Sequence, residues 1–241
     1  MKAPFFLPVK KENVRIILCR IWSPGNVGSI LRAMKNFGFT DIVSVDQMNF
    51  SEEETLTMCA GAKDHFKYLR FSNDLKKEVS DLACVYAFTA RKRRHFRTLD
   101  PSEMSEEISE LPDNAKIGIM FGNETNGLTN EEADLCDKTV VIPTEKDYSS
   151  LNVASAAMIA LYEISRKGKT TEVPDIEMTN IEEKEKLFGV IERVVGTKLM
   201  ERSDNQIQIK ENIRHIFRRL KLNKKEAGFI RSIFEIIDRK I

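Results

Sequence analysis

Short apolar runs, several of them rich in β-branched residues, recur along the first 142 residues of the chain. They cover residues 14–19, 41–46, 83–88, 117–121 and 138–142. Strands that alternate apolar and polar residues have one solvated face, whereas continuous apolar runs suit strands that are buried on both faces. The pattern therefore predicts a parallel sheet.

Helical patterns lie between and after these strands. Residues 25–38 place a set of apolar side chains on one helical face, and Gly38 provides a natural stop. That set comprises Val27, Ile30, Leu31, Met34 and Phe37. After Pro143 breaks the fifth strand, residues 151–163 have the composition of a buried helix. Alternation of strands and helices predicts an α/β fold with right-handed crossovers.

The last third of the chain is different. Residues 168–180 are poor in apolar residues and carry Gly and Pro, which indicates a linker. Beyond it the pattern is purely helical, and Asn223 with Glu226 resembles a capping box. We expect a catalytic domain at 1–167, a linker at 168–180 and a small helical extension at 181–241. About 60 helical residues bury little surface alone, so this extension should dock on the first domain or on a partner subunit.

Composition is that of an ordinary globular protein, with 41% hydrophobic and 31% charged residues among 241. No apolar run reaches the roughly 18 residues of a membrane span, and the N-terminal run is too short for a secretory signal, so we expect a cytoplasmic location. The cysteines and histidines are scattered, which predicts reduced thiols and no metal site. These residues are Cys19, Cys59, Cys84, Cys136, His65, His95 and His215.

Positive charge is clustered although the net charge is only +1. Residues 91–97 contain five Lys or Arg, and residues 205–241 contain ten Lys or Arg against four Asp or Glu. Clustered cations with an interleaved aromatic residue are typical of a polyanion-binding surface. A solvated helix face or loop has the same composition, and composition alone leaves both interpretations open.

Three glycine-, serine- and asparagine-bearing segments lead into helical patterns, at residues 25–32, 121–132 and 142–152. Two of them follow strands directly, and ligands in open α/β sheets bind at the carboxyl ends of strands. Gly122 and Gly127 have P-loop spacing, but Leu128 and Thr129 stand where Lys and Ser or Thr are required. Dinucleotide and nucleophile-elbow motifs are also missing from the sequence, which argues against kinase-like, dehydrogenase and hydrolase functions.

Taken together, the motifs resemble the SPOUT superfamily of RNA methyltransferases, in its TrmH-like branch. The residues that carry the resemblance, in order along the chain, are Gly25-Asn-Val-Gly-Ser-x-x-Arg-Ala-Met-Lys-x-x-Gly38, Ala60-Gly-Ala-x-Asp64, Thr89-Ala-Arg91, Leu99-Asp-Pro-Ser-Glu103, Phe121-Gly-x-Glu124, Gly127-Leu-Thr-Asn-Glu-Glu132 and Tyr148-Ser-Ser-Leu-Asn152. Their order and spacing are specific as a set. One departure is Asn123, which stands where related sequences often have an arginine that could meet RNA phosphate.

The resemblance implies a deep trefoil knot at the C-terminal end of the sheet, a homodimer with each active site at the subunit interface, and S-adenosyl-L-methionine as the cofactor. It implies RNA as the partner and 2′-O-methylation of a ribose as the reaction, first of all at nucleotide 32 (C or U) of the tRNA anticodon loop. An rRNA 2′-O-methyltransferase of the same branch, or a non-catalytic RNA-binding protein on this fold, remain alternatives. The implied cofactor contacts are Phe88, Thr89, Ala90, Gly122, Ile142, Ser149, Ser150 and Leu151.

The resemblance also implies which residues serve catalysis and RNA binding. The catalytic set is Arg32, Asn26, Glu124, Ser150 and Asn152. A guanidinium stays protonated, so Arg32 is expected to stabilise the developing alkoxide rather than act as a base, although a base role stays open. Asn26 and Asn152 have helix capping as simpler roles, and Glu124 that of a helix-entry carboxylate. The expected RNA contacts are Arg91, Arg93, Arg94, Arg97, Arg214 and Arg218.

Overall fold

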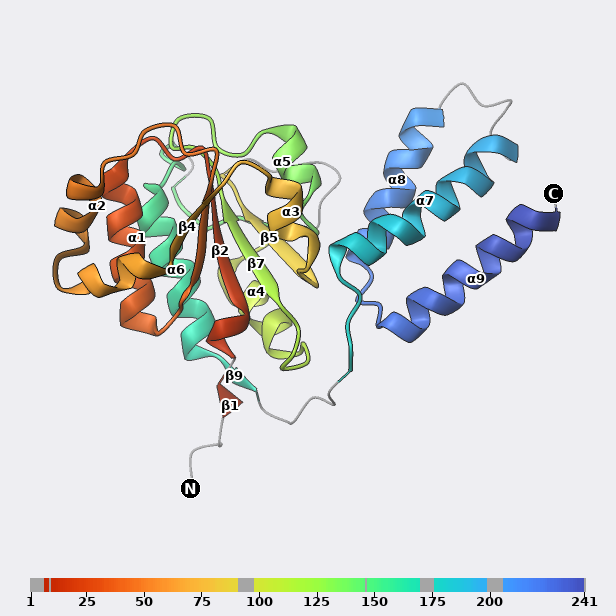
Figure 1. Cartoon of the computed structure of the whole chain (residues 1–241), viewed down its shortest axis with the longest axis horizontal. Coiled ribbons are helices and arrows are strands. Elements are labelled where there is room, and N and C mark those ends of the chain that lie inside the picture. Colours follow the sequence, from red (N-terminus) through yellow and green to blue (C-terminus); the bar gives the residue numbers. More distant parts are fainter. Residues whose placement is uncertain are drawn as a thin grey trace.

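A seven-stranded sheet forms the centre of the N-terminal region of the chain, up to residue 169 (Figure 1). The computed structural model describes residues 7–8, 10–90, 98–145, 147–169, 176–198 and 206–240. The strand order is β4-β3-β2-β7-β5-β8-β6, and each neighbouring pair is parallel. The predicted parallel α/β sheet is thereby confirmed. Its strands are β2 (Val14–Cys19), β3 (Asp41–Val45), β4 (Leu69–Ser72), β5 (Cys84–Phe88), β6 (Thr98–Leu99), β7 (Ile117–Phe121) and β8 (Lys138–Val140).

Helices cover both faces of this sheet. Alternate side chains of β2, such as Ile16 and Ile17, enter two separate apolar clusters, one on each face. One cluster includes α1 and α6, which lie side by side in Figure 1, and the other includes α3, α5 and the start of α7. The α-helices described in the N-terminal region are α1 (Pro24–Phe37), α2 (Glu52–Cys59), α3 (Leu75–Ser80), α4 (Pro101–Ser109), α5 (Asn130–Asp134) and α6 (Val153–Arg166).

Local sequence explains how α1 begins and ends. The Ser23 side chain accepts a hydrogen bond from the backbone N–H of Asn26, and Pro24 occupies the first helical turn. Gly38 ends the helix with φ of 77°, a left-handed conformation that favours glycine. The predicted helix and its glycine stop are therefore confirmed, while the cap at its start is Ser23 and not Asn26.

Shorter elements were not expected from the pattern. The edge strand β4 is only four residues long and mixes Arg70 with exposed Phe71, so it lacks the apolar run that identified the central strands. A two-stranded antiparallel sheet joins β1 (Leu7–Pro8) to β9 (Gly168–Lys169). Two 3-10 helices, Lys11–Asn13 and Ala60–Tyr68, complete the region. All four cysteines are free and buried, as expected, and burial raises the pKa of the Cys84 thiol to about 12.

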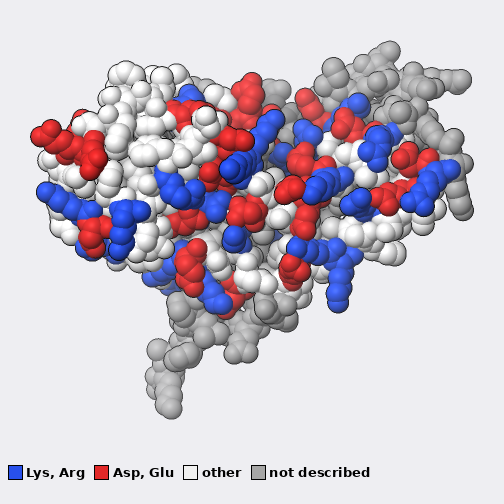
Figure 2. Space-filling view, in the orientation of Figure 1, with Lys and Arg blue, Asp and Glu red and all other residues white. Residues whose placement is uncertain are grey.

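Three helices follow the sheet: α7 (Ile181–Lys198), α8 (Gln206–Arg219) and α9 (Lys224–Lys240). They share a small apolar cluster of their own, built on Leu187, Ile191 and Ala227. The predicted capping box at the start of α9 is confirmed, because Asn223 Oδ1 accepts from Glu226 N and Glu226 accepts from Asn223 N, both at 2.9 Å. Figure 2 shows Lys and Arg interspersed with Asp and Glu over these helices on the face in view.

The helical region is fixed to the sheet by a buried ion pair. Lys184 Nζ donates to Asp137 Oδ1 at 2.9 Å and to the carbonyl oxygen of Ala83 at 2.8 Å. The backbone N–H of Ile181 also donates to Leu82 O at 2.9 Å. A buried ammonium that lost Asp137 would carry a large desolvation cost, so this contact specifies one docking position for α7. Within the described residues, no helix combines the length and apolar character needed to cross a bilayer.

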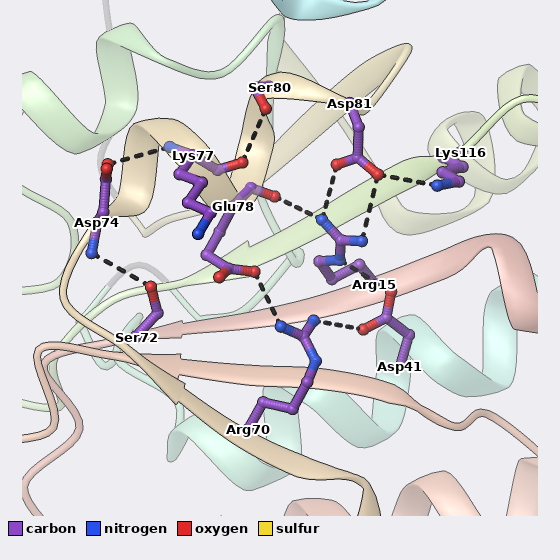
Figure 3. Close-up of polar contacts among 10 residues, drawn as sticks. All are labelled: Arg15, Asp41, Arg70, Ser72, Asp74, Lys77, Glu78, Ser80, Asp81 and Lys116. Atoms are coloured by element: carbon purple, nitrogen blue, oxygen red, sulfur yellow. Dashed lines mark hydrogen bonds and ion pairs between the residues drawn. The ribbon is translucent and has the colours of Figure 1, made fainter.

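Ion pairs join residues at the edge of the sheet where the central strands begin, here called the amino edge (Figure 3). Arg15 lies between Asp41 and Asp81, and donates to a carboxylate oxygen of each at 2.8 Å. Arg70 donates to Asp41 at 2.9 Å, and Lys116 donates to Asp81 at 2.9 Å. Arg15 also donates to the carbonyl oxygen of the residue at position 78, on α3. These contacts tie the starts of β2, β3, β4, β5 and β7 together.

Candidate active site

The opposite edge of the sheet, where the strands end, is here called the carboxyl edge. It carries the three segments singled out from the sequence. The loop at 20–23 follows β2 and leads into the segment 25–32 at the start of α1, the segment 121–132 begins at the end of β7, and the segment 142–152 follows β8. Parallel strands bring the segments that follow them to one edge of a sheet. Segments more than 100 residues apart along the chain therefore form one surface.

A cavity of about 360 Å³ opens at this edge. Its size is within the range of small-molecule sites. All eight residues predicted as cofactor contacts line it, together with apolar side chains that include Phe121, Leu128, Val140 and Val153. The predicted contacts are Phe88, Thr89, Ala90, Gly122, Ile142, Ser149, Ser150 and Leu151. One wall is thus apolar, while the segment 149–151 contributes an exposed, polar rim.

Gly122 allows the backbone of the β7 loop to fold tightly against itself. A Cβ atom at this position would lie 2.2 Å from the carbonyl carbon of Gly127 and 2.2 Å from the nitrogen of Leu128. Real side chains do not approach backbone atoms this closely, so only glycine fits here. The loop that forms one wall of the cavity depends on this contact.

Arg20 holds the same loop from the β2 side, and the sequence reasoning did not find it. It donates to both carboxylate oxygens of Glu132, at 2.6 and 2.8 Å, and to Gly127 O at 2.9 Å. Asn123 Nδ2 in turn donates to Arg20 O at 2.8 Å. The bidentate pair fixes both distance and orientation. Glu132 belongs to a recognisable motif, but its partner lies 112 residues away in a segment without any motif of its own.

A chain of hydrogen bonds joins Glu124, Asn26 and Asn152 beside the cavity. Glu124 Oε1 accepts from Asn26 Nδ2 at 2.9 Å, and Asn26 Oδ1 accepts from Asn152 Nδ2 at 2.9 Å. Asn152 Oδ1 also accepts from the backbone N–H groups of Ala154 and Ser155, which caps α6. Three predicted catalytic residues therefore touch one another, and the simpler capping role holds for Asn152 at the same time.

Glu124 has two further donors, the backbone N–H groups of Trp22 at 2.9 Å and Ser23 at 3.1 Å. Burial acts to raise the pKa of Glu124, but the hydrogen bonds from Trp22, Asn26 and Ser23 outweigh it and hold the pKa below its usual value. Glu124 is therefore ionised at neutral pH. It fixes the direction of the Asn26 amide and, through it, that of Asn152.

Arg32 lies apart from these residues within one chain. It is exposed on α1 and is not among the described residues that line the cavity. Ser150 lines the cavity rim. The structure of a single chain thus brings four of the five predicted catalytic residues to one edge, with Arg32 on a neighbouring helix surface.

The predicted RNA contacts divide into two groups. Arg91, Arg93, Arg94 and Arg97 lie outside the described residues. Arg214 and Arg218, on α8, both pair with the carboxylate of Glu185, at 3.2 and 2.7 Å. Arg218 is only 8% exposed, whereas the Arg214 side chain is 44% exposed and lies over the Phe188 ring. Of the two, Arg214 is the one that presents its guanidinium to solvent.

Comparison with known proteins supplies independent information. Residues 13–162 match the SpoU rRNA methylase family. The chain is 30% identical over 235 residues to the tRNA (cytidine/uridine-2′-O-)-methyltransferase TrmJ of Photorhabdus laumondii, which covers 95% of this chain and 98% of that protein. It is also similar to the crystal structure of TrmJ from Z. mobilis, with a TM-score of 0.76, 26% identity, and coverage of 93% of this chain and 98% of that one.

A third similarity concerns the cofactor. The SpoU methyltransferase AviRb from Streptomyces viridochromogenes, solved in complex with AdoMet, aligns with a TM-score of 0.51 and 25% identity, over 69% of this chain and 62% of that chain. The family match at residues 13–162 covers the strands from β2 to β8 and the three segments that meet at the carboxyl edge of the sheet. The chain therefore belongs to the SpoU rRNA methylase family.

Proposed function

We propose that this chain transfers a methyl group from S-adenosyl-L-methionine to a ribose 2′-oxygen of tRNA, at nucleotide 32 (C or U) of the anticodon loop. The observation that carries the proposal is the cavity at the carboxyl edge, whose lining contains every predicted cofactor contact beside the Glu124–Asn26–Asn152 chain. Family membership supports the methyl transfer, and the full-length similarity to a tRNA methyltransferase supports tRNA as the substrate.

The cavity suits the proposed cofactor in size and chemistry. Apolar side chains such as Phe88, Leu128 and Ile142 offer a wall for the adenine ring, and the exposed backbone of 149–151 offers N–H and C=O groups to its polar edge. Gly122 lets the loop that forms one wall of the cavity pack against the backbone of Gly127 and Leu128. When bound, the cofactor supplies an electrophilic methyl group on a sulfonium sulfur.

The remaining chemistry falls to the side chains of this protein. The 2′-hydroxyl must lose its proton to solvent water as its oxygen attacks, so negative charge develops on that oxygen. We assign its stabilisation to the Arg32 guanidinium, which stays protonated and acts by charge rather than as a base. Because Arg32 is exposed and lies outside the cavity lining of its own chain, we assign it to the site of the partner in a homodimer. Glu124 and Asn26 hold the amide of Asn152 towards the acceptor.

The dimer and the RNA surface belong to the same proposal. Exposed apolar residues on and before α6, namely Leu151, Met158 and Tyr162, offer a surface for the second subunit. The knot implied by the resemblance would comprise the segments after β7 and β8 that surround the cavity. Residues 181–241 would bind the RNA backbone, with Arg214 as the more exposed of the two arginines expected there, as would the basic run at 91–97. A tRNA substrate also favours a cytoplasmic location.

One assay tests the function. The purified protein is incubated with labelled S-adenosyl-L-methionine and, in separate reactions, unmodified bulk tRNA and unmodified rRNA, and the products are digested and identified by nucleoside mass spectrometry. We expect 2′-O-methylcytidine and 2′-O-methyluridine from tRNA. Methylated nucleosides from rRNA alone would show that rRNA, and not tRNA, is the substrate. Absence of methyl transfer to both RNAs would contradict the enzymatic function and favour a non-catalytic RNA-binding protein.

A further inference from the structure

Trp22, the single tryptophan of the chain, is 58% exposed on the loop between β2 and α1. A tryptophan ring carries more apolar surface than other side chains, and proteins usually bury most of it. Met48, on the loop between β3 and α2, is 56% exposed. In Figure 2, uncharged side chains predominate at the upper left of the face, over the end of the sheet that carries this loop.

The backbone around Trp22 is held on every side. The N–H of Arg20 donates to Val45 O at 2.8 Å, and Gln47 Nε2 donates to Ile21 O at 2.6 Å. The carboxylate of Glu124 accepts from the N–H of Trp22 at 2.9 Å and from the next N–H along the chain at 3.1 Å. The ring is therefore presented on a rigid segment. The protein backbone loses little conformational entropy when a ligand packs on this ring.

Two bridging side chains bring Met48 to the same surface. Gln47 Nε2 donates to Asn49 O at 2.6 Å as well as to Ile21 O, so the two loops are linked. Asn123 Nδ2 donates to Arg20 O and lies 4.0 Å from Met48 Sδ. The three loops that carry Trp22, Met48 and the wall of the cavity thus form one continuous surface.

The chemistry of this surface favours the flat face of a base over a phosphate. The amide of Asn123 is engaged with Arg20 O, and the guanidinium of Arg20 is paired with Glu132. The carboxylate of Glu124, which accepts from the backbone of this loop, repels phosphate. An exposed aromatic ring on the same surface as a thioether instead suits π stacking, and proteins that bind single-stranded RNA use aromatic side chains in this way.

We propose that Trp22, with Met48 exposed on the same surface, is a stacking platform for a base of single-stranded RNA adjacent to the ribose that receives the methyl group. The inference rests on the proposed function for the identity of the RNA. It assigns an RNA contact that the motifs of the resemblance did not include. Glu124 connects the two tasks, because one carboxylate holds both the Trp22 backbone and the Asn26 amide.

Intrinsic fluorescence reports on this contact directly, because Trp22 is the single tryptophan. In the protein alone, iodide should quench the emission, since the ring is exposed. Unmodified tRNA transcript, or an oligouridine of about ten nucleotides, should quench the emission itself and protect the ring from iodide. S-adenosyl-L-methionine alone should leave iodide access unchanged. RNA binding without any change in emission would overturn the proposal.

A matched pair of variants separates stacking from simple apolar burial. Trp22→Phe keeps a π face, whereas Trp22→Leu keeps apolar bulk without one. We expect Trp22→Leu to raise the dissociation constant for tRNA by about ten-fold, the usual effect of losing one stacked base, and Trp22→Phe to recover most of the affinity. Equal affinities for the two variants would overturn the proposal, and circular dichroism checks that both are folded.

Two further measurements separate RNA stacking on Trp22 from self-association of the chain and from the enzymatic function. If the ring instead packs against a second copy of the chain, iodide access will fall as protein concentration rises without RNA, and the proposal is wrong. Methyl transfer is measured separately. Quenching by RNA without transfer would support the stacking contact and overturn the enzymatic function, whereas transfer that Trp22→Leu leaves unchanged would do the reverse.

Discussion

Carboxylates at the two edges of the sheet are stabilised in different ways, by cations for Asp41 and Asp81 and by neutral donors for Glu124. At the amino edge, Asp41 and Asp81 each lie against cations, and Arg15 bridges them. At the carboxyl edge, Glu124 is held by two backbone N–H groups and an amide, with no cation among its described partners. The first arrangement pairs each carboxylate with cations and so cancels its charge. The second stabilises a carboxylate while its charge and its neighbours remain available beside a cavity of about 360 Å³.

This difference separates a structural edge from a functional one. Burial acts to lower the pKa of Arg15, yet hydrogen bonds to Asp41 and Asp81 outweigh it and raise the pKa above its usual value, so the pairs favour the charged forms of Arg15 and Asp81. Substitutions at the amino edge should therefore alter stability and spare catalysis. Substitutions at the carboxyl edge should alter catalysis by more than they alter stability.

The largest effect is expected for Arg32→Ala. Loss of a guanidinium that stabilises the developing alkoxide should lower turnover by roughly 100-fold or more, with the affinity for S-adenosyl-L-methionine unchanged. The matched control is Arg70→Ala, which removes an arginine from the amino edge and should leave turnover within about two-fold, since exposed ion pairs contribute little. Single-turnover methyl transfer measures both. Near-normal turnover for Arg32→Ala would remove this residue from the mechanism.

Gly122→Ala should have the next largest effect, through the cofactor cavity. The new Cβ would lie 2.2 Å from backbone atoms of Gly127 and Leu128, so the loop must move. Overpacking costs about 1–3 kcal/mol, and we expect the dissociation constant for S-adenosyl-L-methionine to rise by about ten-fold or more. Gly61→Ala is the control, because a Cβ there meets nothing within 4 Å. Calorimetric titration that gave equal affinities for the two variants would contradict the assigned cradle.

Glu124→Gln tests whether the carboxylate positions its neighbours by charge. A neutral amide loses the charge-assisted hydrogen bonds from Trp22, Ser23 and Asn26, and we expect turnover to fall by about ten-fold. Because the folded state lowers the pKa of Glu124, its stabilising effect is complete above the ordinary glutamate value of about 4.3 and is lost as pH falls through the lowered pKa. The stability gap between wild type and Glu124→Gln should therefore close in acid.

Urea unfolding at several pH values measures this gap, and turnover at neutral pH measures the catalytic effect. Glu12→Gln, an exposed glutamate that precedes β2, is the control and should change neither quantity. A gap that persisted at low pH would show that the substitution acts through shape and not through charge.

The sequence predicts each edge to a different extent, for physical reasons. Buried central strands carry continuous apolar runs, and Gly38 or Asn223 ends or begins a helix through local chemistry, so these features are visible in the pattern. The family motifs also located the cavity lining. The edge strand β4 pairs with β3 on one side only and contains no buried residue. It therefore does not need the apolar run that marks the central strands.

Long-range contacts are the part that the pattern misses. Arg20 meets Glu132 across 112 residues, and neither local propensity nor periodicity records that pairing. The basic composition of the last helices predicted exposed cations, but packing leaves Arg218 only 8% exposed against Glu185. Likewise, the exposed position of Trp22 follows from three converging loops and not from its neighbours in the chain.

The smallest effect is expected for Asp81→Asn, which tests whether the ion pairs of the amino edge contribute to stability alone. It removes the charged partner shared by Arg15 and Lys116. Burial acts to raise the pKa of Asp81, but the hydrogen bonds from Lys116 and Arg15 outweigh it and lower the pKa. The stabilisation is thus present above the ordinary aspartate value of about 3.9 and disappears as pH falls through the lowered pKa.

Because Asp81 is partly exposed, solvent screens these pairs, and the loss in unfolding free energy at neutral pH should be about 1 kcal/mol or less. Added salt should shrink the difference between Asp81→Asn and wild type, as expected for surface charges. Turnover should equal that of wild type. A loss of turnover with unchanged stability would show that the amino edge communicates with the cavity, and the division of labour between the two edges would then be wrong.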